Sequence, residues 1–518
     1  MQPNKPFIST DMFKSYFKVG SWTGLSRVFG LLRDITTTGL LGSSMLHDIF
    51  VVVLKIPNVF RRFFAEGAFS QAFIPIYNEY QEHRSTEEIK DFINNLAGTL
   101  LAILFVFTLI ALFFAPIFIF IFAPGFYFDP VKKDLAVNIL RIMFPYLGLI
   151  SLVAFAGGIQ NSHQRFSLPA ATPIIFNLCI IFSAFFLAPL FSISIVGLAW
   201  GVLLAGIIQL LIQLAPLSQI DRLPIPKIGI SNEGVKKVFI LMLPAIIAGG
   251  VAQINLLIDT IFASLLVTGS PTWLYVSDRL IQFPLGIFAI AIGTVLLPTL
   301  SKANQRGDLI SYKEQLRKSQ RLVIFLAIPS LIGLAICSEH LISTLFQRGE
   351  FLYSDVAQAS KSLVAFSFGL PFFMLMKVLV PAFFSRKDTK TPMYAAIAAL
   401  TLNIVLNYYF TIILGYGHTG LALASSIAAL LSSGILFTIL IKDKYIQLSN
   451  PLNRFNLALI LGSFSIIVFL LYGPFNIDFN SLSFFERLLN LTLEVGISIL
   501  LYLFITRAII GSKLRELF

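Results

Sequence analysis

Charged side chains stand inside apolar stretches of this sequence, most densely in LKIPNVFRRFFAEGAFSQAFIP at residues 54–75. At about 100° per residue along a helix, Asp48, Lys55, Arg62 and Glu66 fall within about 40° of one direction. Eighteen residues of helix rise about 27 Å, which is close to the hydrocarbon thickness of a bilayer. We expect this polar stripe to line a path across a membrane.

Two other apolar stretches carry charges of both signs. Arg27 and Asp34 are seven residues apart and share a helix face, Arg33 adjoins Asp34, and Asp278 and Arg279 precede LIQFP. A charge at the bilayer centre costs about 2.5–3.5 kcal/mol, so these groups must face a wet cavity, reach the headgroups or pair with acids. Guanidinium groups suit bidentate phosphate binding. Because cations exceed acids, the pattern favours a cationic cavity for a phosphorylated, anionic substrate.

The charges also allow a purely structural reading. Intramembrane Arg–Asp pairs such as Arg33–Asp34 can staple helices together, and Arg62 and Glu66 can satisfy each other four residues apart. Arg141 lies near a predicted span end, where its side chain can snorkel to the interface. For Lys377, in the middle of a predicted span, both readings stay open.

The elements that position these charges are membrane helices. Of the 518 residues, 57% are hydrophobic and 12% are charged, against about 25% charged in soluble proteins. Apolar runs recur along the whole chain, which predicts an all-α polytopic membrane protein with about fourteen transmembrane helices. The predicted spans are 15–38, 46–79, 91–122, 134–160, 169–189, 193–216, 236–267, 271–300, 319–346, 357–384, 392–414, 418–441, 453–473 and 485–508.

The distribution of basic residues predicts the orientation. If the N-terminus is cytoplasmic, segments at or near the cytoplasmic ends of the spans hold 25 of the 38 Lys and Arg, and the outer loops hold four. This bias follows the positive-inside rule and places both termini in the cytoplasm. The net charge of +12 is then explained by anionic membrane lipid, and no nucleic-acid partner is expected. The basic segment KANQRGDLISYKEQLRKSQR at 302–321 is expected to form an amphipathic helix on the membrane surface, with a capping box at Ser311 and Glu314.

The chain also repeats itself. AFSQAFIP ends at Pro75 and AIGTVLLP ends at Pro298, while QRFSLP ends at Pro169 and DTKTP ends at Pro392. Both pairs have an offset of 223 residues, which predicts a six-helix unit used twice in the same orientation. The expected organisation is a lobe at 1–217, a cytoplasmic linker at 218–235, a second lobe at 236–445, and two added helices at 446–518. Cys179 and Cys337 lie in apolar runs and predict neither a disulfide framework nor a metal site, and no cofactor is expected.

Four segments resemble one known family. They are LSRVFGLLRD at 25–34, KIPNVFRRFFAEGAFSQAFIP at 55–75, DRLIQFPLGIFAIAIGTVLLPTLSK at 278–302 and KVLVPAFFSRKDTKTP at 377–392. The sequence is similar over nearly its whole length to the MurJ (MviN) family, the lipid II flippases of the MOP exporter superfamily. The resemblance implies a fourteen-helix protein of the bacterial inner membrane, with two six-helix lobes around a central cationic cavity. It also implies a groove for the undecaprenyl tail on the last two helices. The implied activity is movement of the lipid-linked peptidoglycan precursor to the outer leaflet by alternating access, and the implied partners are lipid II, membrane lipids and, transiently, the cell-wall synthesis machinery.

The resemblance places the family's functional residues on particular positions. We therefore predict that substrate is bound by Arg27, Arg33, Arg61, Arg62 and Arg279, supported or gated by Asp34, Asp48, Lys55, Glu66, Asp278 and Lys377. One departure is Gln282, where some members are expected to carry an acid, and this puts in doubt a carboxylate role on that turn.

Other functions remain as alternatives. An exporter of another polyprenyl-linked oligosaccharide would use the same chemistry, and only the family motifs oppose it. A cation or drug antiporter should have an acidic cavity, which the excess of cations disfavours. A membrane-embedded enzyme would normally need a catalytic acid, often in a large outer loop, and the outer loops here are short. A pure scaffold is similarly disfavoured.

Overall fold

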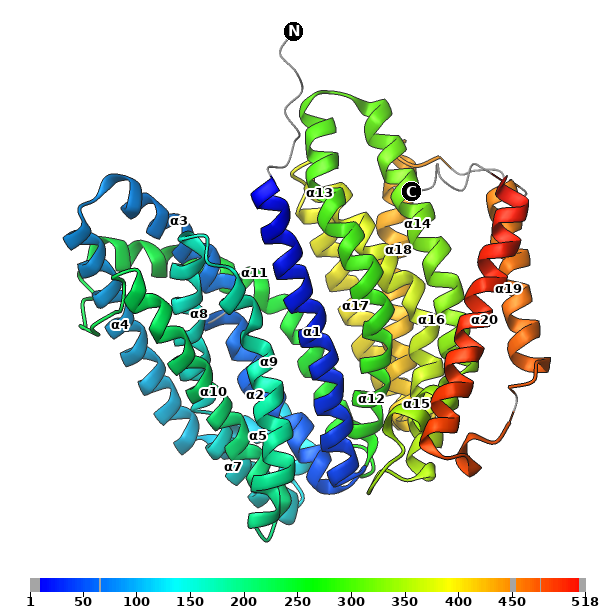
Figure 1. Ribbon diagram of the computed structural model, residues 1–518, viewed down its shortest axis with the longest axis horizontal. Coiled ribbons are helices and arrows are strands. Elements are labelled where there is room, and N and C mark those ends of the chain that lie inside the picture. Colours follow the sequence, from blue (N-terminus) through cyan, green and yellow to red (C-terminus); the bar gives the residue numbers. More distant parts are fainter. Residues whose placement is uncertain (1–9, 65–66, 448–452, 476, 512–518) are drawn as a thin grey trace. The chain divides into compact units, whose positions relative to one another are not determined.

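The computed structural model describes residues 10–64, 67–447, 453–475 and 477–511, and their regular elements are all helices (Figure 1). The structure describes the side chains of all these residues except 10–19, 247–252 and 255–256. This confirms the predicted all-α class. The chain separates into two compact units, residues 1–265 (unit 1) and 266–518 (unit 2).

Unit 1 is built around aromatic and aliphatic side chains of α2, α4, α7 and α8. Phe60 of α2 lies 5.1 Å from Phe107 and 6.1 Å from Phe144, measured between ring centroids. A second core joins α3, α4, α8 and α11. The helices are α1 (Thr10–Leu41), α2 (Met45–Phe64), α3 (Gly67–His83), α4 (Thr86–Phe113), α5 (Ala115–Phe122), α6 (Pro124–Tyr127), α7 (Pro130–Met143), α8 (Tyr146–Ser162), α9 (Ser167–Phe182), the π-helix η1 (Ser183–Leu187), the 3-10 helix η2 (Ala188–Leu190), α10 (Ser194–Gln219) and α11 (Glu233–Ser264).

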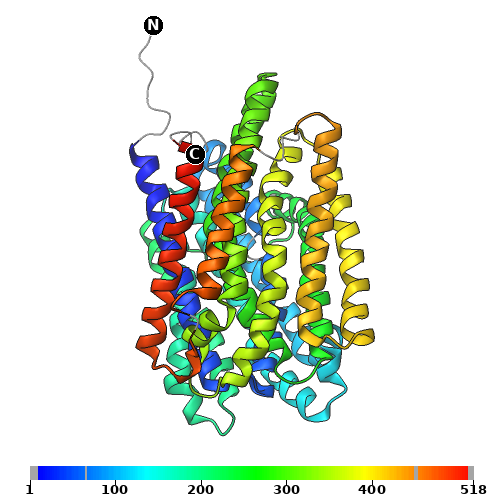
Figure 2. The ribbon, with the colours of Figure 1, turned by 90° about the vertical axis from the view of Figure 1, so that its right-hand side faces the viewer.

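Unit 2 is organised around α16, which packs against α12, α14 and α18. Figure 2 shows the last two long helices, α19 and α20, beside each other. The elements are α12 (Ser270–Pro284), the π-helix η3 (Leu285–Ala289), α13 (Ile290–Gln305), α14 (Leu309–Ile336), α15 (Ser338–Phe346), α16 (Tyr353–Phe384), α17 (Lys390–Tyr408), the π-helix η4 (Tyr409–Ile413), α18 (Gly417–Lys442), α19 (Arg454–Tyr472), the 3-10 helix η5 (Phe479–Ser481) and α20 (Phe484–Ile510).

The helix boundaries carry the internal repeat. The bounds of α1 and α11, of α4 and α14, and of α10 and α18 lie 223 residues apart at both ends. Pro169 and Pro392 are each the third residue of their helices, and both helices end in a π-helical turn. The two units meet between residues 265 and 266, so α11 belongs to unit 1. This division does not test the predicted lobes, which remain a prediction.

Eleven helical segments within the described residues are long and apolar enough to cross a membrane, so the predicted count of fourteen is not confirmed. The other three predicted spans fall on α1, on α2 and α3, and on α11. Helix α2 is not counted among the eleven because four of its residues are charged, which makes it insufficiently apolar. The predicted span 46–79 covers α2, described to Phe64, and α3, described from Gly67; residues 65 and 66 lie outside the described residues, so the continuity of this span stays a prediction.

Two connecting segments differ from expectation or add to it. The basic segment 302–321 does not form one helix of its own, because it is divided between the end of α13 and the first turns of α14. Asp308 caps α14 by accepting from the backbone N–H of Ser311, in place of the predicted capping box. Residues 222–230, here called the strap, lie along α4, where the backbone N–H of Lys227 donates to the carbonyl of Asn94 at 3.0 Å.

Candidate functional site

The charged residues of α1 form a buried ion pair. Arg33 donates from Nε at 2.9 Å and from a terminal nitrogen at 2.6 Å to the same oxygen of Asp34. The guanidinium carbon lies 5.7 Å from the ring centre of Phe176 on α9, within the range of a cation–π contact. Because α1 packs along α9, these contacts fix the Arg33 side chain on the inner face of unit 1.

Helix α2 brings further polar groups into the interior of unit 1. His47 and Asp48 are buried, and His47 is close enough to Asp34 for an electrostatic interaction. Further along, Nζ of Lys55 donates to Oγ1 of Thr260 on α11 at 3.4 Å. The sequence prediction did not include His47 or Thr260. The available signal was polar residues in an apolar helix, but their partners lie on other helices and are not visible in the sequence.

Arg61 and Arg62 lie in the last turn of α2. Phe60 packs into the aromatic core, and Arg62, about 200° further round the helix, is exposed. Arg62 makes no hydrogen bond or ion pair with any described residue. Glu66, its predicted partner, lies outside the described residues.

Arg27 is also exposed. It lies on a part of α1 where Leu25 and Val28 are exposed too, and within the described part of the chain its guanidinium has no polar contact. No described residue occupies the guanidinium donors of Arg27 and Arg62, whereas Arg33 directs donors from two of its nitrogens to Asp34. Arg61 is half-buried.

Unit 2 has a smaller polar group on α12. Arg279 donates to the hydroxyl of Tyr275 at 3.0 Å, with its guanidinium carbon 4.9 Å from the centre of that ring. The amide of Gln282 donates to Asp278 at 2.5 Å. Gln282 therefore serves as a hydrogen-bond partner of the carboxylate on the preceding turn, which gives this position a role that the sequence left in doubt.

Lys377 on α16 is exposed and makes no hydrogen bond or ion pair with a described residue. Its backbone carbonyl lies so close to Gly293 of α13 that a Cβ atom there would be 2.8 Å from it. The glycine thus allows the close approach of α13 to α16 at this lysine.

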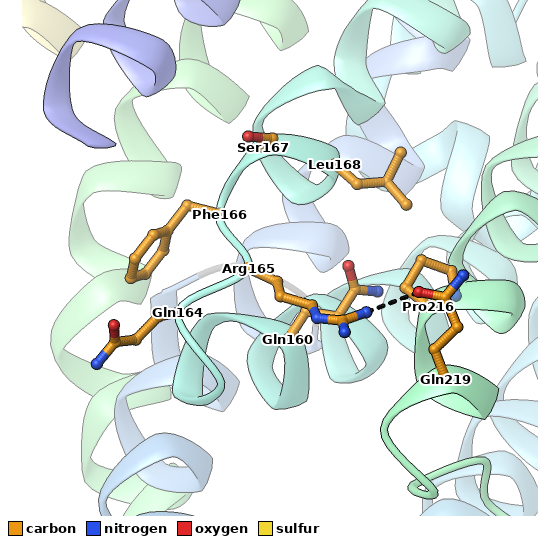
Figure 3. A pocket seen from close by; sticks show the side chains of 8 residues that line it. All are labelled: Gln160, Gln164, Arg165, Phe166, Ser167, Leu168, Pro216 and Gln219. Atoms are coloured by element: carbon orange, nitrogen blue, oxygen red, sulfur yellow. Dashed lines mark hydrogen bonds between the residues drawn. The ribbon is translucent and has the colours of Figure 1, made fainter. Parts of the chain in front are cut away.

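A cavity of about 300 Å³ lies where α8, α9 and α10 meet (Figure 3). Arg165 crosses it and donates to Oε1 of Gln219 at 2.9 Å. None of the predicted site residues that the structure describes lines it. The lining residues are Gln160, Gln164, Arg165, Phe166, Ser167, Leu168, Pro216 and Gln219.

Most of the predicted residues thus divide into three kinds. Arg33 and Asp34 hold each other; Lys55, Asp278 and Arg279 have polar protein partners; and the side chains of Arg27, Arg62 and Lys377 are exposed cations. Outside these three kinds, Asp48 is buried, Arg61 is half-buried and Glu66 lies outside the described residues. Exposed guanidinium groups can bind phosphate through paired hydrogen bonds. The chemistry that these exposed cations support is binding of an anion. Their role in substrate binding remains a prediction.

Comparison with known proteins decides the family. The sequence profile described as "MurJ: Lipid II flippase MurJ" matches residues 38–491. The chain belongs to the MurJ family. A Vibrio cholerae relative named "Probable lipid II flippase MurJ" is 42% identical over 437 residues, covering 83% of each chain. A Burkholderia cenocepacia relative named "Lipid II flippase MurJ" is 37% identical over 454 residues, covering 87% of this chain and 88% of the relative.

Solved structures agree with the family. One described as "Lipid II flippase MurJ, inward closed conformation" has a TM-score of 0.78 and 28% sequence identity, over 96% of this chain and 99% of the other. An inward-facing multidrug resistance MATE transporter of the MOP superfamily has a TM-score of 0.64 at 13% identity, over 81% of this chain and 95% of the other. At that identity the second likeness concerns the fold alone.

Proposed function

We propose that this chain is a lipid II flippase, which moves the undecaprenyl-diphosphate-linked peptidoglycan precursor from the cytoplasmic to the outer leaflet of the bacterial inner membrane. The observation that carries this function is the match to relatives named lipid II flippase over more than four fifths of both chains. The relatives are named as flippases, and we propose that this chain likewise moves its substrate without catalysing a covalent reaction.

The exposed arginines are proposed to bind the diphosphate of the substrate. The guanidinium groups of Arg27 and Arg62 have no polar partner among the described residues, and a diphosphate offers paired acceptor oxygens of matching geometry. Arg33 is proposed to act while held by Asp34, and Arg61, Arg279 and Lys377 to contribute positive charge at some stage of the cycle. Alternating access requires that the inward-open and outward-open states bind the substrate with different affinity, because equal affinity shifts no equilibrium.

The hydrocarbon tail needs an apolar surface that stays open to lipid. Helices α19 and α20 expose large apolar side chains, among them Ile460, Phe464, Leu500 and Phe504. We propose that this pair, within residues 446–518, accommodates the tail beside lobes at 1–217 and 236–445, which a linker at 218–235 connects. The strap contacts of that linker and the 223-residue repeat support this division.

Both termini are proposed to be cytoplasmic, on the basis of the excess of Lys and Arg in the segments that would then face the cytoplasm. A transient contact with the cell-wall synthesis machinery is proposed on the family resemblance. Reporter fusions at each terminus test the orientation: activity of a cytoplasmic reporter at both ends is expected, and a periplasmic signal at either end contradicts it.

Rescue of a bacterium whose own lipid II flippase can be switched off tests the proposed function. The unchanged chain should restore growth, whereas Arg27→Ala and Arg62→Ala should lose most of the rescue at equal membrane abundance. Arg62→Lys should rescue weakly, because lysine keeps the charge but not the bidentate geometry. Arg141→Ala is the matched control: Arg141 is an exposed arginine of unit 1 whose Nε donates to the carbonyl of Leu112, and its loss should leave rescue intact. Failure of a well-inserted unchanged chain would favour another polyprenyl-linked substrate.

A further inference from the structure

Unit 2 contains a cluster of three metal-ligating side chains that is separate from the charges discussed above. Cys337 follows the last residue of α14, His340 lies in the first turn of α15, and Glu494 lies on α20. One ligand atom from each lies within 4.8 Å of the others. It is the one group of this kind in the part of the chain that the structure describes. The sequence did not reveal it, because Glu494 follows His340 by 154 residues.

The cluster is buried and its geometry is fixed. Cys337 and Glu494 are each 1% exposed. Nδ1 of His340 lies 2.9 and 3.1 Å from the two carboxylate oxygens of Glu494. The imidazole ring stacks on Phe479 with centroids 3.9 Å apart and an angle of 9° between the planes, which holds Nδ1 toward the carboxylate. Three donor atoms therefore face one another at a place that bulk water does not reach directly.

The spacing of the donor atoms suits a metal ion. Tetrahedral zinc binds nitrogen and oxygen at about 2.0–2.2 Å and thiolate at about 2.3 Å, which puts neighbouring ligand atoms about 3.4 Å apart. The present nitrogen–oxygen distances are slightly shorter than this, and all separations are below 4.8 Å, so an ion between the three groups requires shifts of well under 2 Å. The side chain of His340 is 18% exposed, which leaves a route of entry.

The mixed donor set indicates the class of ion. Thiolate, imidazole and carboxylate together select a borderline divalent metal such as zinc over magnesium or calcium, which prefer oxygen ligands. Three protein ligands leave a fourth position for water.

We propose that Cys337, His340 and Glu494 bind one divalent transition-metal ion of the zinc class. On binding, the thiol proton passes to solvent as the sulfur–metal bond forms, and the neutral imidazole binds through Nδ1 with its proton on Nε2, so no electron is transferred. The ion ties α20 to the junction of α14 and α15, and thus fixes the last pair of helices to the rest of unit 2.

Cobalt(II) provides a direct test, because a thiolate ligand gives the bound ion a characteristic charge-transfer absorption. The purified full-length protein in detergent, stripped of metal, is titrated with Co²⁺ alone. We expect one ion per chain with a thiolate band, displaced by Zn²⁺. Cys337→Ser should abolish the band, and Cys179→Ser, which removes the other buried free cysteine, should leave it unchanged.

Two further variants keep the proposal falsifiable if Cys337→Ser does not fold. His340→Ala and Glu494→Gln should each weaken binding by more than about 100-fold, the upper range for residues that only support a ligand. Each variant is checked by size-exclusion chromatography. Absence of a thiolate band in the unchanged protein, or an equal band in Cys337→Ser, would overturn the proposal. The cluster would then serve only to hold Glu494 in place through hydrogen bonds.

Discussion

Replacing Asp34 by alanine should destabilise unit 1 more than any loss of a surface ion pair. Arg33 is 8% exposed and Asp34 is 1% exposed, and two nitrogens of the guanidinium donate to one carboxylate oxygen. In Asp34→Ala the guanidinium loses this partner while the surrounding packing still holds it. Removing one member of a buried ion pair typically costs about 3–5 kcal/mol, of which the contact with Phe176 can offset about 0.5–2 kcal/mol. The expected loss is therefore about 1–4.5 kcal/mol.

A double-mutant cycle separates the interaction from the cost of each change. Arg33→Met alone leaves the Asp34 carboxylate buried and should cost a similar amount. The double variant Arg33→Met/Asp34→Ala leaves neither charge buried, so it should be less destabilised than Asp34→Ala alone. This outcome is expected because the attraction between the two groups mainly offsets their desolvation.

Unfolding of the purified protein in mixed micelles by sodium dodecyl sulfate, followed by circular dichroism, gives the free energies. Glu314→Ala is the control, because Glu314 and Lys318 form an ion pair at 3.0 Å with both side chains more than 40% exposed. That change should cost only about 0.3–0.5 kcal/mol. The reasoning is refuted if Asp34→Ala costs no more than Glu314→Ala, or if the double variant loses the full sum of the two single changes.

Two other perturbations test the packing and the loops. Gly98→Ala should destabilise unit 1, because a Cβ there would lie 2.2 Å from the backbone oxygen of Lys227 in the strap. In the control Gly333→Ala on α14, the added Cβ meets nothing within 4 Å, so the change should be neutral or stabilising by up to about 1 kcal/mol. Thermal unfolding of both variants measures the difference. Hydrogen bonds from the backbone and side chain of Thr391 lower the pKa of Asp388 in the loop before α17. The stability that the ionised Asp388 carboxylate gives the folded protein is therefore fully present above the unfolded-state pKa of about 3.9. It is lost as the pH falls through the lower folded-state pKa. Between these two pKa values, the melting temperature of Asp388→Asn should fall less with acidification than that of the unchanged protein. An equal fall in both proteins would contradict the stabilising role of the Asp388 carboxylate.

The fold class followed from the sequence because long apolar helices and a repeat leave direct marks on it. The offset between Pro75 and Pro298 predicted the period that the helix bounds show at both ends of three helix pairs. The continuity of the predicted span 46–79 stays a prediction, because residues 65 and 66 between α2 and α3 lie outside the described residues.

The polar contacts were less predictable than the helices. The sequence identified Arg33 and Asp34 as a possible pair because adjacent residues need no knowledge of the fold. It could not identify Thr260 as the partner of Lys55, since 205 residues separate them and their meeting depends on how α11 packs. The same holds for Glu494 beside His340. Partners across helices are set by tertiary packing, which a single sequence does not encode in readable form.

Exposure of lipid II on the outer face of the membrane tests the central claim most directly. In cells whose own flippase is shut off, a membrane-impermeant toxin that degrades lipid II is added from outside, with or without this chain. The account predicts that the unchanged chain restores cleavage of lipid II and that Arg279→Ala, inserted to the same level, does not. Lipid II that stays protected in cells containing the well-inserted, unchanged chain would contradict the account.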